Sequence, residues 1–358
     1  MLTALTACSH SGEDEPRPDD TAVLSLRIRL NRPDAGASRA TGDEYEADKK
    51  AAGDAERMHT LRIIIAGADG RAEHNTLWDL SANPDVEFVG QDYPVKANEQ
   101  KTIILVANEA GVTLTKADGT KIDATSYLRS IDASIGSAVD MDELRQLTMQ
   151  ADDNSDGKGC LKTPTAMTAI HYYYVAGAKR NYKATFYIHR AAVKYSFRFT
   201  NSDSKKTRTV GSVSVNNFAS GQYFFPDFDF TDATQLFWNS YNTPAGVTVA
   251  EKTLESGITL APGETRELAS VYVPEGGAAA TDNPYKIAFT VDDRNSGWLP
   301  LNWSMPQTPE TTQLMTDLPR NTHVIVNVTL TPETPMSFTI DYTICPWTER
   351  EINIPDFN

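Results

Sequence analysis

Apolar and polar residues alternate over many short segments of this chain, which is the period of a β-strand. The clearest early segment covers residues 22–30. Its apolar members are Leu24, Leu26, Ile28 and Leu30, and polar residues stand between them. Turn formers and small residues fill 31–40, and no regular pattern returns until after Arg57. We predict a half-buried strand followed by an exposed loop that contains the Arg39–Ala40 bond.

Further strands are predicted on both sides of a short helical insert. Compact β-branched runs at 58–66 and 101–108 indicate buried strands. Between residues 123 and 150 the pattern becomes helical, because Met141, Leu144 and Leu147 recur every three residues and acidic residues occupy the first turn. Later strand signals are nearly continuous, at 182–188, 193–200, 209–218, 246–250, 258–260, 267–272, 285–292, 323–330, 336–345 and 349–354.

Many short strands between clusters of Gly, Pro, Asn and Asp predict a mainly β, or all-β, fold with small helical inserts. The 358 residues suit two domains that each bury a core. A break in the apolar pattern near 177–181 divides the chain. We expect two β-sandwich domains in tandem, at 22–180 and 181–358, after a leading segment at 1–21.

The composition excludes some partners. There are 33 basic and 48 acidic residues, for a net charge of −15, and such a surface disfavours nucleic acid. No run of about 20 apolar residues is present, so no membrane span is expected.

The three cysteines, Cys8, Cys160 and Cys345, are too far apart in the sequence for a metal or redox motif. The residues before Cys8, however, form a motif of their own. Residues 5–8 read Leu-Thr-Ala-Cys, which resembles the lipobox of bacterial lipoproteins. The polar, acidic residues 9–20 suit a flexible tether. Seven residues before Cys8 are too few for a signal peptide, so we expect a truncated chain or a start further upstream.

Catalytic motifs are missing from the sequence. The six histidines are scattered without an H-x-x-x-H pair, and there is no Gly-x-Ser-x-Gly elbow. Residues 152–157 match the first half of a calcium loop, but Thr163 stands where a glutamate should close it, which favours a solvated turn. We predict that the protein is not an enzyme, with no catalytic residues, no cofactor and no metal ion.

Aromatic clusters leave two interpretations open, a sugar-stacking platform or ordinary core, and the core is the commoner role in strand-rich proteins. The aromatic residues concerned are at 172–174 and 223–225, with Phe228, Phe230, Trp238, Trp298 and Trp303.

The tail repeats the pattern of the first strand. Phe338, Ile340, Tyr342 and Ile344 alternate with polar residues up to Pro346 and Trp347, which interrupt the pattern. A shorter alternation follows at Ile352 and Ile354. We predict two extended segments at the end of the chain.

Taken in order, these features resemble the fimbrillin family of type V pilins, lipoprotein-derived fimbrial subunits of Gram-negative anaerobes. The resemblance rests on the lipobox at Cys8, the strand at 22–30, the Arg39–Ala40 bond, the strands around Ile63 and Ile104, residues 188–194, and the paired terminal strands. It implies two transthyretin-like, Greek-key sandwiches. It also implies a lipoprotein exported to the outer membrane through lipid on Cys8, and then a cell-surface fimbrium that supports adhesion.

The resemblance also implies an assembly mechanism. An Arg-specific surface protease cuts after Arg39 and releases the strand that carries Leu24, Leu26, Ile28 and Leu30. Donor residues from a neighbour's tail then fill the groove by strand addition, and they are Phe338, Ile340, Tyr342 and Ile344, or Ile352 and Ile354. The implied partners are other fimbrial subunits, in a homopolymer with an anchor and a tip.

Several alternatives stay open from the sequence. A cut site and a tail together favour a stalk subunit over an anchor or tip, although Arg57 and the Lys49–Lys50 pair offer other bonds to a protease. A monomeric outer-membrane surface lipoprotein that binds glycans or host proteins would use the same β modules, and so would an enzyme, because β-sandwiches host all three.

Overall fold

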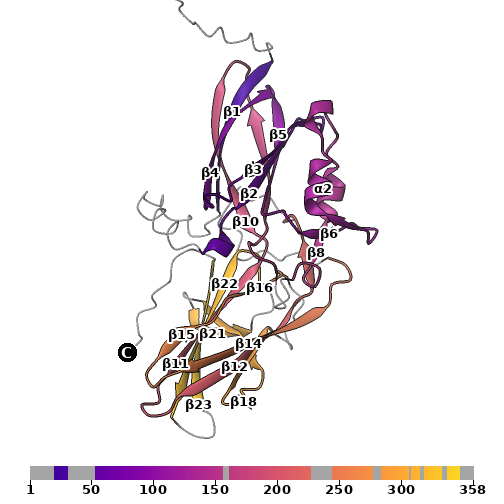
Figure 1. Cartoon of the computed structure of the whole chain (residues 1–358). Helices are drawn as coiled ribbons and strands as arrows, with labels where there is room; N and C mark the ends of the chain where they lie inside the picture. The colour runs from indigo at the N-terminus through magenta and orange to yellow at the C-terminus, as the bar shows by residue number, and fades with distance from the viewer. Residues whose placement is uncertain are drawn as a thin grey trace, which may run out of the picture.

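A computed structural model describes residues 20–30, 53–155, 161–226, 244–276, 284–305, 308–314, 318–332 and 337–346. Strands dominate, and the helices are short. Figure 1 shows two bodies along the long axis, the upper one built from the first half of the chain and the lower one from the second half. The predicted all-β fold with tandem sandwiches is therefore confirmed.

The upper body is organised by a seven-stranded sheet in the order β3-β2-β5-β9-β10-β1-β4. Its strands are β1 (Thr21–Leu30), β2 (Thr60–Ala66), β3 (Ala72–Asp79), β4 (Glu87–Lys96), β5 (Glu99–Ala107), β9 (Met167–Val175) and β10 (Asn181–Arg190). β9 and β10 pair at only two positions, His189 with Thr168 and Arg190 with Met167. The sheet turns at this corner, so that β3-β2-β5-β9 and β10-β1-β4 form two layers.

The space between the two layers is the first hydrophobic core. It contains Ile63 and Ile65 from one layer and Ile28 and Ile188 from the other. Ile64, on the opposite face of β2, belongs to a second core. A strand that is buried on both faces explains the continuous apolar run read at 58–66.

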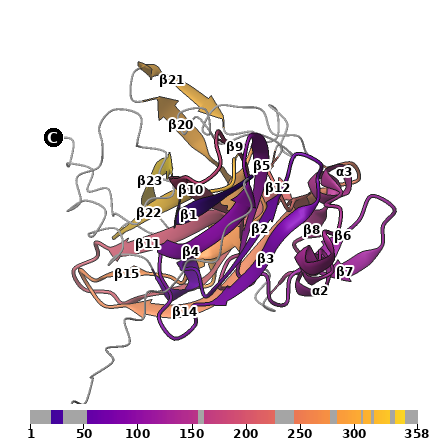
Figure 2. The same ribbon diagram turned by 90° about the horizontal axis from the view of Figure 1, so that it is seen from above.

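The second core lies under the helical insert. Figure 2 shows the insert beside β2 and β3. The insert holds α2 (Ala124–Arg129), η3 (Ala133–Ile135), α3 (Met141–Gln146) and a small sheet of β6 (Thr113–Thr115), β7 (Lys121–Asp123), β8 (Thr148–Gln150) and β13 (Gly221–Tyr223). Asp140 caps α3 by accepting a hydrogen bond from the Glu143 amide. α3 ends before Leu147, which is extended, because the next residues join β8.

The lower body packs two sheets around a third core. One sheet runs β15-β11-β22-β23, with β16 beside β11, and the other runs β14-β12-β17-β18, with β19 beside β17. The strands are β11 (Val193–Asn201), β12 (Arg208–Ala219), β14 (Val249–Leu260), β15 (Thr265–Glu267), β16 (Val271–Val273), β17 (Lys286–Val291), β18 (Arg294–Asn295), β19 (Leu299–Pro300), β22 (Thr322–Thr331) and β23 (Ser337–Pro346). β20 (Asn302–Met305) and β21 (Thr308–Leu314) form a separate hairpin.

Two of the predicted strand boundaries in this body differ from the structure. Residues 249–250 of the predicted segment 246–250 and the whole segment 258–260 belong to one strand, β14, which follows β12 over its whole length, whereas residues 246–248 precede the strand. Its exposed polar residues, such as Glu251 and Glu255, hid the pattern. The segment at 267–272 is divided between β15 and β16, which pair with different parts of β11.

The change from one body to the next comes after β10. This strand pairs with β1 from Asn181 to Ile188, and β11 in the lower body begins at Val193. The division at residue 180 stays a prediction, but the backbone pairing of residues 181–190 belongs to the first sheet. The pairing therefore favours a boundary at Ala191 and Ala192.

Arg320 holds the two bodies together from a buried position. Its Nε lies 2.7 Å from an oxygen of Glu275, and its Nη1 lies 3.0 Å from the carbonyl oxygen of Phe224 and 3.2 Å from the hydroxyl of Thr168 on β9. A fully buried guanidinium needs such partners, because an unpaired buried charge is costly.

No helix among the described residues is long and apolar enough to cross a membrane.

Candidate functional site

β1 is the middle strand of the layer β10-β1-β4. It pairs in parallel with β10 from Val23 to Leu30, and antiparallel with β4 from Thr21 to Arg29, with one irregularity between Ser25 and Arg27. Both edges of the strand are therefore used. Its removal would leave a slot between β10 and β4.

The inward face of β1 is apolar throughout. Every second residue lies in the first core, and none is more than 5 % exposed: Ala22, Leu24, Leu26, Ile28 and Leu30. At about 1.5–3 kcal/mol for each large side chain, four of them contribute roughly 6–12 kcal/mol before ordering costs. The predicted inward positions are confirmed as core, whereas their displacement stays a prediction.

The outward face of β1 is bound to β4 through polar contacts. The Nε of Arg29 lies 2.7 Å from an oxygen of Glu87, and the Nε of Arg27 lies 3.3 Å from the same oxygen. The Ser25 hydroxyl donates to Asp92. The Glu87 side chain is 15 % exposed, so this carboxylate depends on its two cations more than a solvated one would.

The chain leaves β1 at Leu30 and is described again from Gly53, so Arg39 and Ala40 lie outside the described residues. The 3-10 helix η2 (Asp54–Glu56) follows directly. Glu56 is buried, and its carboxylate accepts hydrogen bonds from Lys194, at 2.5 Å, and from the Tyr272 hydroxyl, at 3.1 Å. Its carbonyl accepts from Arg190.

Burial opposes the ionisation of Glu56, but the charges of Arg190 and Lys194 outweigh it and lower the pKa of the carboxyl. Lys194 and Tyr272 belong to strands of the lower body. The chain that follows residue 52 is therefore fixed to both bodies at Glu56, through Lys194, Tyr272 and Arg190. A cut within 31–52 would separate β1 from this anchor.

β3 and β4, the two edges of the seven-stranded sheet, are joined by side chains instead of a backbone ladder. The Trp78 indole donates to the Tyr93 hydroxyl at 3.0 Å, and the ring of His74 packs edge-on against Tyr93 at 5.2 Å. Trp78 also contacts the ring of Phe88. We call Trp78, His74, Tyr93 and Phe88 the β3–β4 seam.

The tail strand β23 occupies an edge of its own sandwich. It pairs antiparallel with β22 over its whole length. Phe338, Ile340 and Tyr342 pack partly buried against the lower core, with the ring of Phe338 5.0 Å from that of Phe289. Burial raises the pKa of the Tyr342 hydroxyl to about 12. Among the described strands, β22 is the only one that pairs with β23.

Of the other predicted donor and processing residues, the structure describes the backbone of Ile344. The backbone of Ile344 pairs with Val324. Ile352, Ile354 and Cys8 lie outside the described residues. The predicted strand at 336–345 matches β23, whereas its transfer to a neighbour stays a prediction.

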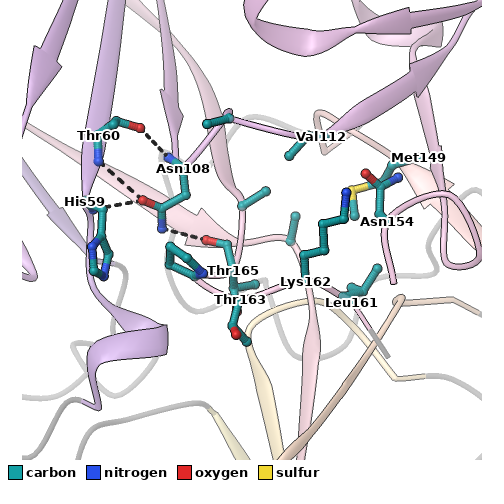
Figure 3. A pocket seen from close by; sticks show the side chains of 14 residues that line it. His59, Thr60, Asn108, Val112, Met149, Asn154, Leu161, Lys162, Thr163 and Thr165 are labelled. Atoms are coloured by element: carbon teal, nitrogen blue, oxygen red, sulfur yellow. Dashed lines mark hydrogen bonds between the residues drawn. The ribbon is translucent and has the colours of Figure 1, made fainter. Parts of the chain in front are cut away.

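A pocket of about 320 Å³ lies where residues 161–166 pass the end of β5 (Figure 3). The Asn108 side chain, central in this view, accepts from the His59 amide and donates to the Thr165 carbonyl, each at 2.8 Å. Lys162 donates to the carbonyl of Gly111. These polar groups are hydrogen-bonded within the protein, and the other residues that line the pocket are largely apolar.

Four of the described histidines have a different hydrogen-bond partner at the ring Nε2 atom. The ring Nε2 atoms of His59, His74, His171 and His323 lie near Asp54, Pro94, Tyr187 and Ser196 respectively. His189 is fully buried, and burial holds its pKa well below the usual value. Within the described ranges, no group of three or more His, Cys, Asp or Glu side chains could hold a metal ion.

The half-matched calcium loop is occupied by protein contacts where it is described. Asp152 pairs with Lys252 at 3.0 Å, and Asp153 pairs with Lys121 at 2.7 Å. The side chain of Asn154 is buried and bonds to the backbone of Thr113. These contacts favour a structural turn.

The aromatic clusters are distributed between core and surface. Phe224 and Phe225 are fully buried, whereas Tyr174 is 58 % exposed and Trp298 is 41 % exposed. Tyr172 and Tyr173 pack partly buried against different cores. Phe228, Phe230 and Trp238 lie outside the described residues.

Comparison with known proteins gives a shared fold. No family model and no curated protein matches the sequence. A proposed cell adhesion protein from Parabacteroides distasonis matches with a TM-score of 0.53 at 12 % identity, over 90 % of this chain and 96 % of that one. The tip fimbrial protein Mfa3 from Porphyromonas gingivalis, solved with a C-terminal truncation, also matches with a TM-score of 0.53 at 12 % identity, over 91 % of this chain and 100 % of that one. The chain therefore has a fimbrial- and adhesin-like fold.

Sequence reasoning missed the Glu56 cluster and the β3–β4 seam. Both join residues that are distant in the chain, such as Glu56 with Tyr272, and no local pattern marks them. A buried acidic residue next to a predicted loop gives no periodic signal.

Proposed function

We propose that this protein is a structural subunit, in the stalk position, of a cell-surface fimbrium that supports adhesion. The subunit is exported as a lipoprotein through Cys8, and an Arg-specific protease then cuts after Arg39. β1 leaves, and the tail of a neighbouring subunit takes its place. The neighbours are other fimbrial subunits.

The position of β1 is the observation that supports this proposal most. It is a central strand with a fully apolar inward face, and the chain continues from it directly into residues 31–52, which include Arg39. The next described part of the chain is bound at Glu56 to Lys194 of β11. One cut would therefore leave β1 held by non-covalent contacts alone.

The tail supports the other half of the exchange. β1 and β23 are each 10 residues long and carry four large apolar residues at alternate positions. β1 is paired along both edges, whereas β23 has one partner strand among the described ones. Transfer of β23 from its own edge into a slot adds a second ladder of main-chain hydrogen bonds, which favours exchange.

Two variants test the mechanism by complementation. Arg39→Ala keeps the tail but blocks the proposed cut, and a chain that ends at residue 332 keeps the cut but lacks both tail segments. We expect an Arg-specific protease to convert the wild-type protein into ladders that resist dissociation in detergent. Neither variant should form ladders alone, and a protease-treated mixture should stop at heterodimers.

N-terminal sequencing of the cut protein should identify Ala40 as the new first residue. Circular dichroism of the shortened chain controls for folding, since β23 contributes to the lower core. A monomer that keeps residues 22–30 after protease treatment would contradict the stalk assignment and favour the glycan- or protein-binding lipoprotein. Ladders formed by the Arg39→Ala variant would contradict this cut site.

A further inference from the structure

β4, which forms one side of the β1 slot, carries a negative charge at Glu87, and a donor strand would have to lie next to it. Glu87 on β4 faces Arg27 and Arg29, and it is mostly buried beneath them. On the opposite wall, the residue beside Arg27 is Thr185, which is neutral. The nearest cation on that wall, Lys183, lies beside Ser25 instead. When β1 leaves, Glu87 loses both arginines.

The chain's own tail cannot replace these arginines. When the four apolar residues of the tail take the places of Leu24, Leu26, Ile28 and Leu30, the residue at their centre takes the place of Arg27. That residue is Asp341. Because 341 is central in 338–344, as 27 is in 24–30, the same match arises whichever way the strand runs.

The remaining outward positions do not compensate. The position of Arg29 would receive Thr343 or, in the reversed direction, Thr339, and both are neutral. In the second tail segment, the residues that alternate with Ile352 and Ile354 are Glu351, Asn353 and Pro355, and none of them is basic. A second copy of this chain would therefore place a carboxylate against Glu87, where like charges repel.

We propose that the slot left by β1 accepts the tail of a second copy of this chain less readily than the tail of a different subunit, one with alternating aliphatic residues inward and Arg or Lys at the central outward position. This inference rests on the proposed strand exchange and adds the choice of partner. Repulsion of the wrong strand is as effective for specificity as attraction of the right one. Conversely, the Asp341 tail suits a slot whose wall is neutral or basic.

Peptide competition on the full chain tests this choice. The chain is cut after Arg39 and mixed with labelled peptides of residues 336–346, each with Cys345→Ser to prevent oxidation. One peptide has the natural sequence, one carries Asp341→Asn and one carries Asp341→Arg. A peptide of residues 21–30 is the positive control. Native mass spectrometry measures how much of each peptide replaces β1.

We expect the Asp341→Arg peptide to half-replace β1 at about tenfold lower concentration than the natural peptide, with Asp341→Asn in between, since a charged hydrogen bond is gained and a repulsion removed. On a Glu87→Gln subunit, the advantage of Arg over Asp should fall to about twofold or less. The ratio between peptides is compared, so weaker binding of β1 in this variant affects both equally.

The outcomes separate the two proposals. Equal replacement by the natural and Asp341→Arg peptides would overturn the choice of partner while the exchange itself stands. If the Asp341→Arg peptide still replaces β1 at about tenfold lower concentration in Glu87→Gln, the choice of partner is also overturned, because a group other than Glu87 would then bind the arginine. If no peptide binds, including residues 21–30, the slot does not open and both proposals fail.

Discussion

The Nζ of Lys194 lies 2.5 Å from the Glu56 carboxylate, and this contact joins η2 to the first strand of the lower body. Both side chains are largely buried, at 6 % exposed for Glu56 and 15 % for Lys194. Arg190 lies against the Glu56 carbonyl from the end of β10. The ion pair with Lys194 and the hydrogen bond from Arg190 together fix η2 to both bodies at Glu56.

Replacement of Glu56 by Gln should destabilise the folded protein substantially. Lys194 would keep its charge in a buried place without its carboxylate, and breaking a buried pair costs about 3–5 kcal/mol. Urea unfolding should show this loss. Lys121→Ala is the matched control, because its ion pair with Asp153 is more exposed, and such pairs contribute at most about 1 kcal/mol. Equal losses in both variants would contradict a structural role for the Glu56 cluster.

The core position of Ile28 predicts a large effect on the uncut protein. Ile28 is fully buried, and Ile→Ala in a core typically costs about 2–5 kcal/mol. We expect Ile28→Ala to lower the free energy of unfolding by that amount and to speed the loss of β1 after cleavage. Arg27→Ala, on the exposed face, should cost about 1 kcal/mol or less. Unfolding in urea measures the first effect, and the release rate of the fragment that ends at Arg39 measures the second.

Stability should fall between neutral and mildly acidic pH because of His323. Burial, together with the charge of Lys194, lowers the pKa of its ring to about 3. The unfolded chain takes up this proton near pH 6.5, so stability is lost as the pH falls below 6.5, at about 1.4 kcal/mol per pH unit.

The variant His323→Gln keeps a side-chain amide that can hydrogen-bond to Ser196 and removes the titration. Between pH 7.5 and 5, wild type should lose about 2 kcal/mol relative to this variant. His189, whose pKa is also lowered, is present in both proteins and cancels. Glu56 acts in a lower range, because its lowered pKa makes its stabilisation fall away only as the pH drops below about 4.5. Parallel pH profiles for the two proteins would contradict the assignment to His323.

The β3–β4 seam should matter most after β1 has gone. β4 then loses its strand partner and is held to β3 through Trp78 and Tyr93. In the uncut protein, Trp78→Phe should cost about 1 kcal/mol, the usual loss for one hydrogen bond. After cleavage, we expect faster amide hydrogen exchange in residues 87–96 of this variant than in wild type. The matched variant Trp298→Phe, at an exposed position, should leave that exchange unchanged.

The sequence determined the local elements whose patterns are strictly periodic. Alternation at 22–30 and 338–345 gave β1 and β23 nearly to the residue, because a period of two specifies which side chains share a face. The acidic first turn before Leu144 gave α3, although its end was missed, since the pairing of β8 stops the helix. β14 was read as two pieces because polar residues line an exposed strand.

Only the tertiary structure decided how these elements meet. Strand order placed β1 between β10 and β4, and no local pattern encodes which strands become neighbours. The corner at His189 and Arg190 divided one sheet into two layers. The pairing of Glu56 with Lys194, and of Glu87 with Arg27 and Arg29, likewise depends on chain segments that are far apart in sequence. A periodic pattern fixes which side of a strand is apolar, but the packing of the whole chain fixes what that side, and the charged side opposite, will contact.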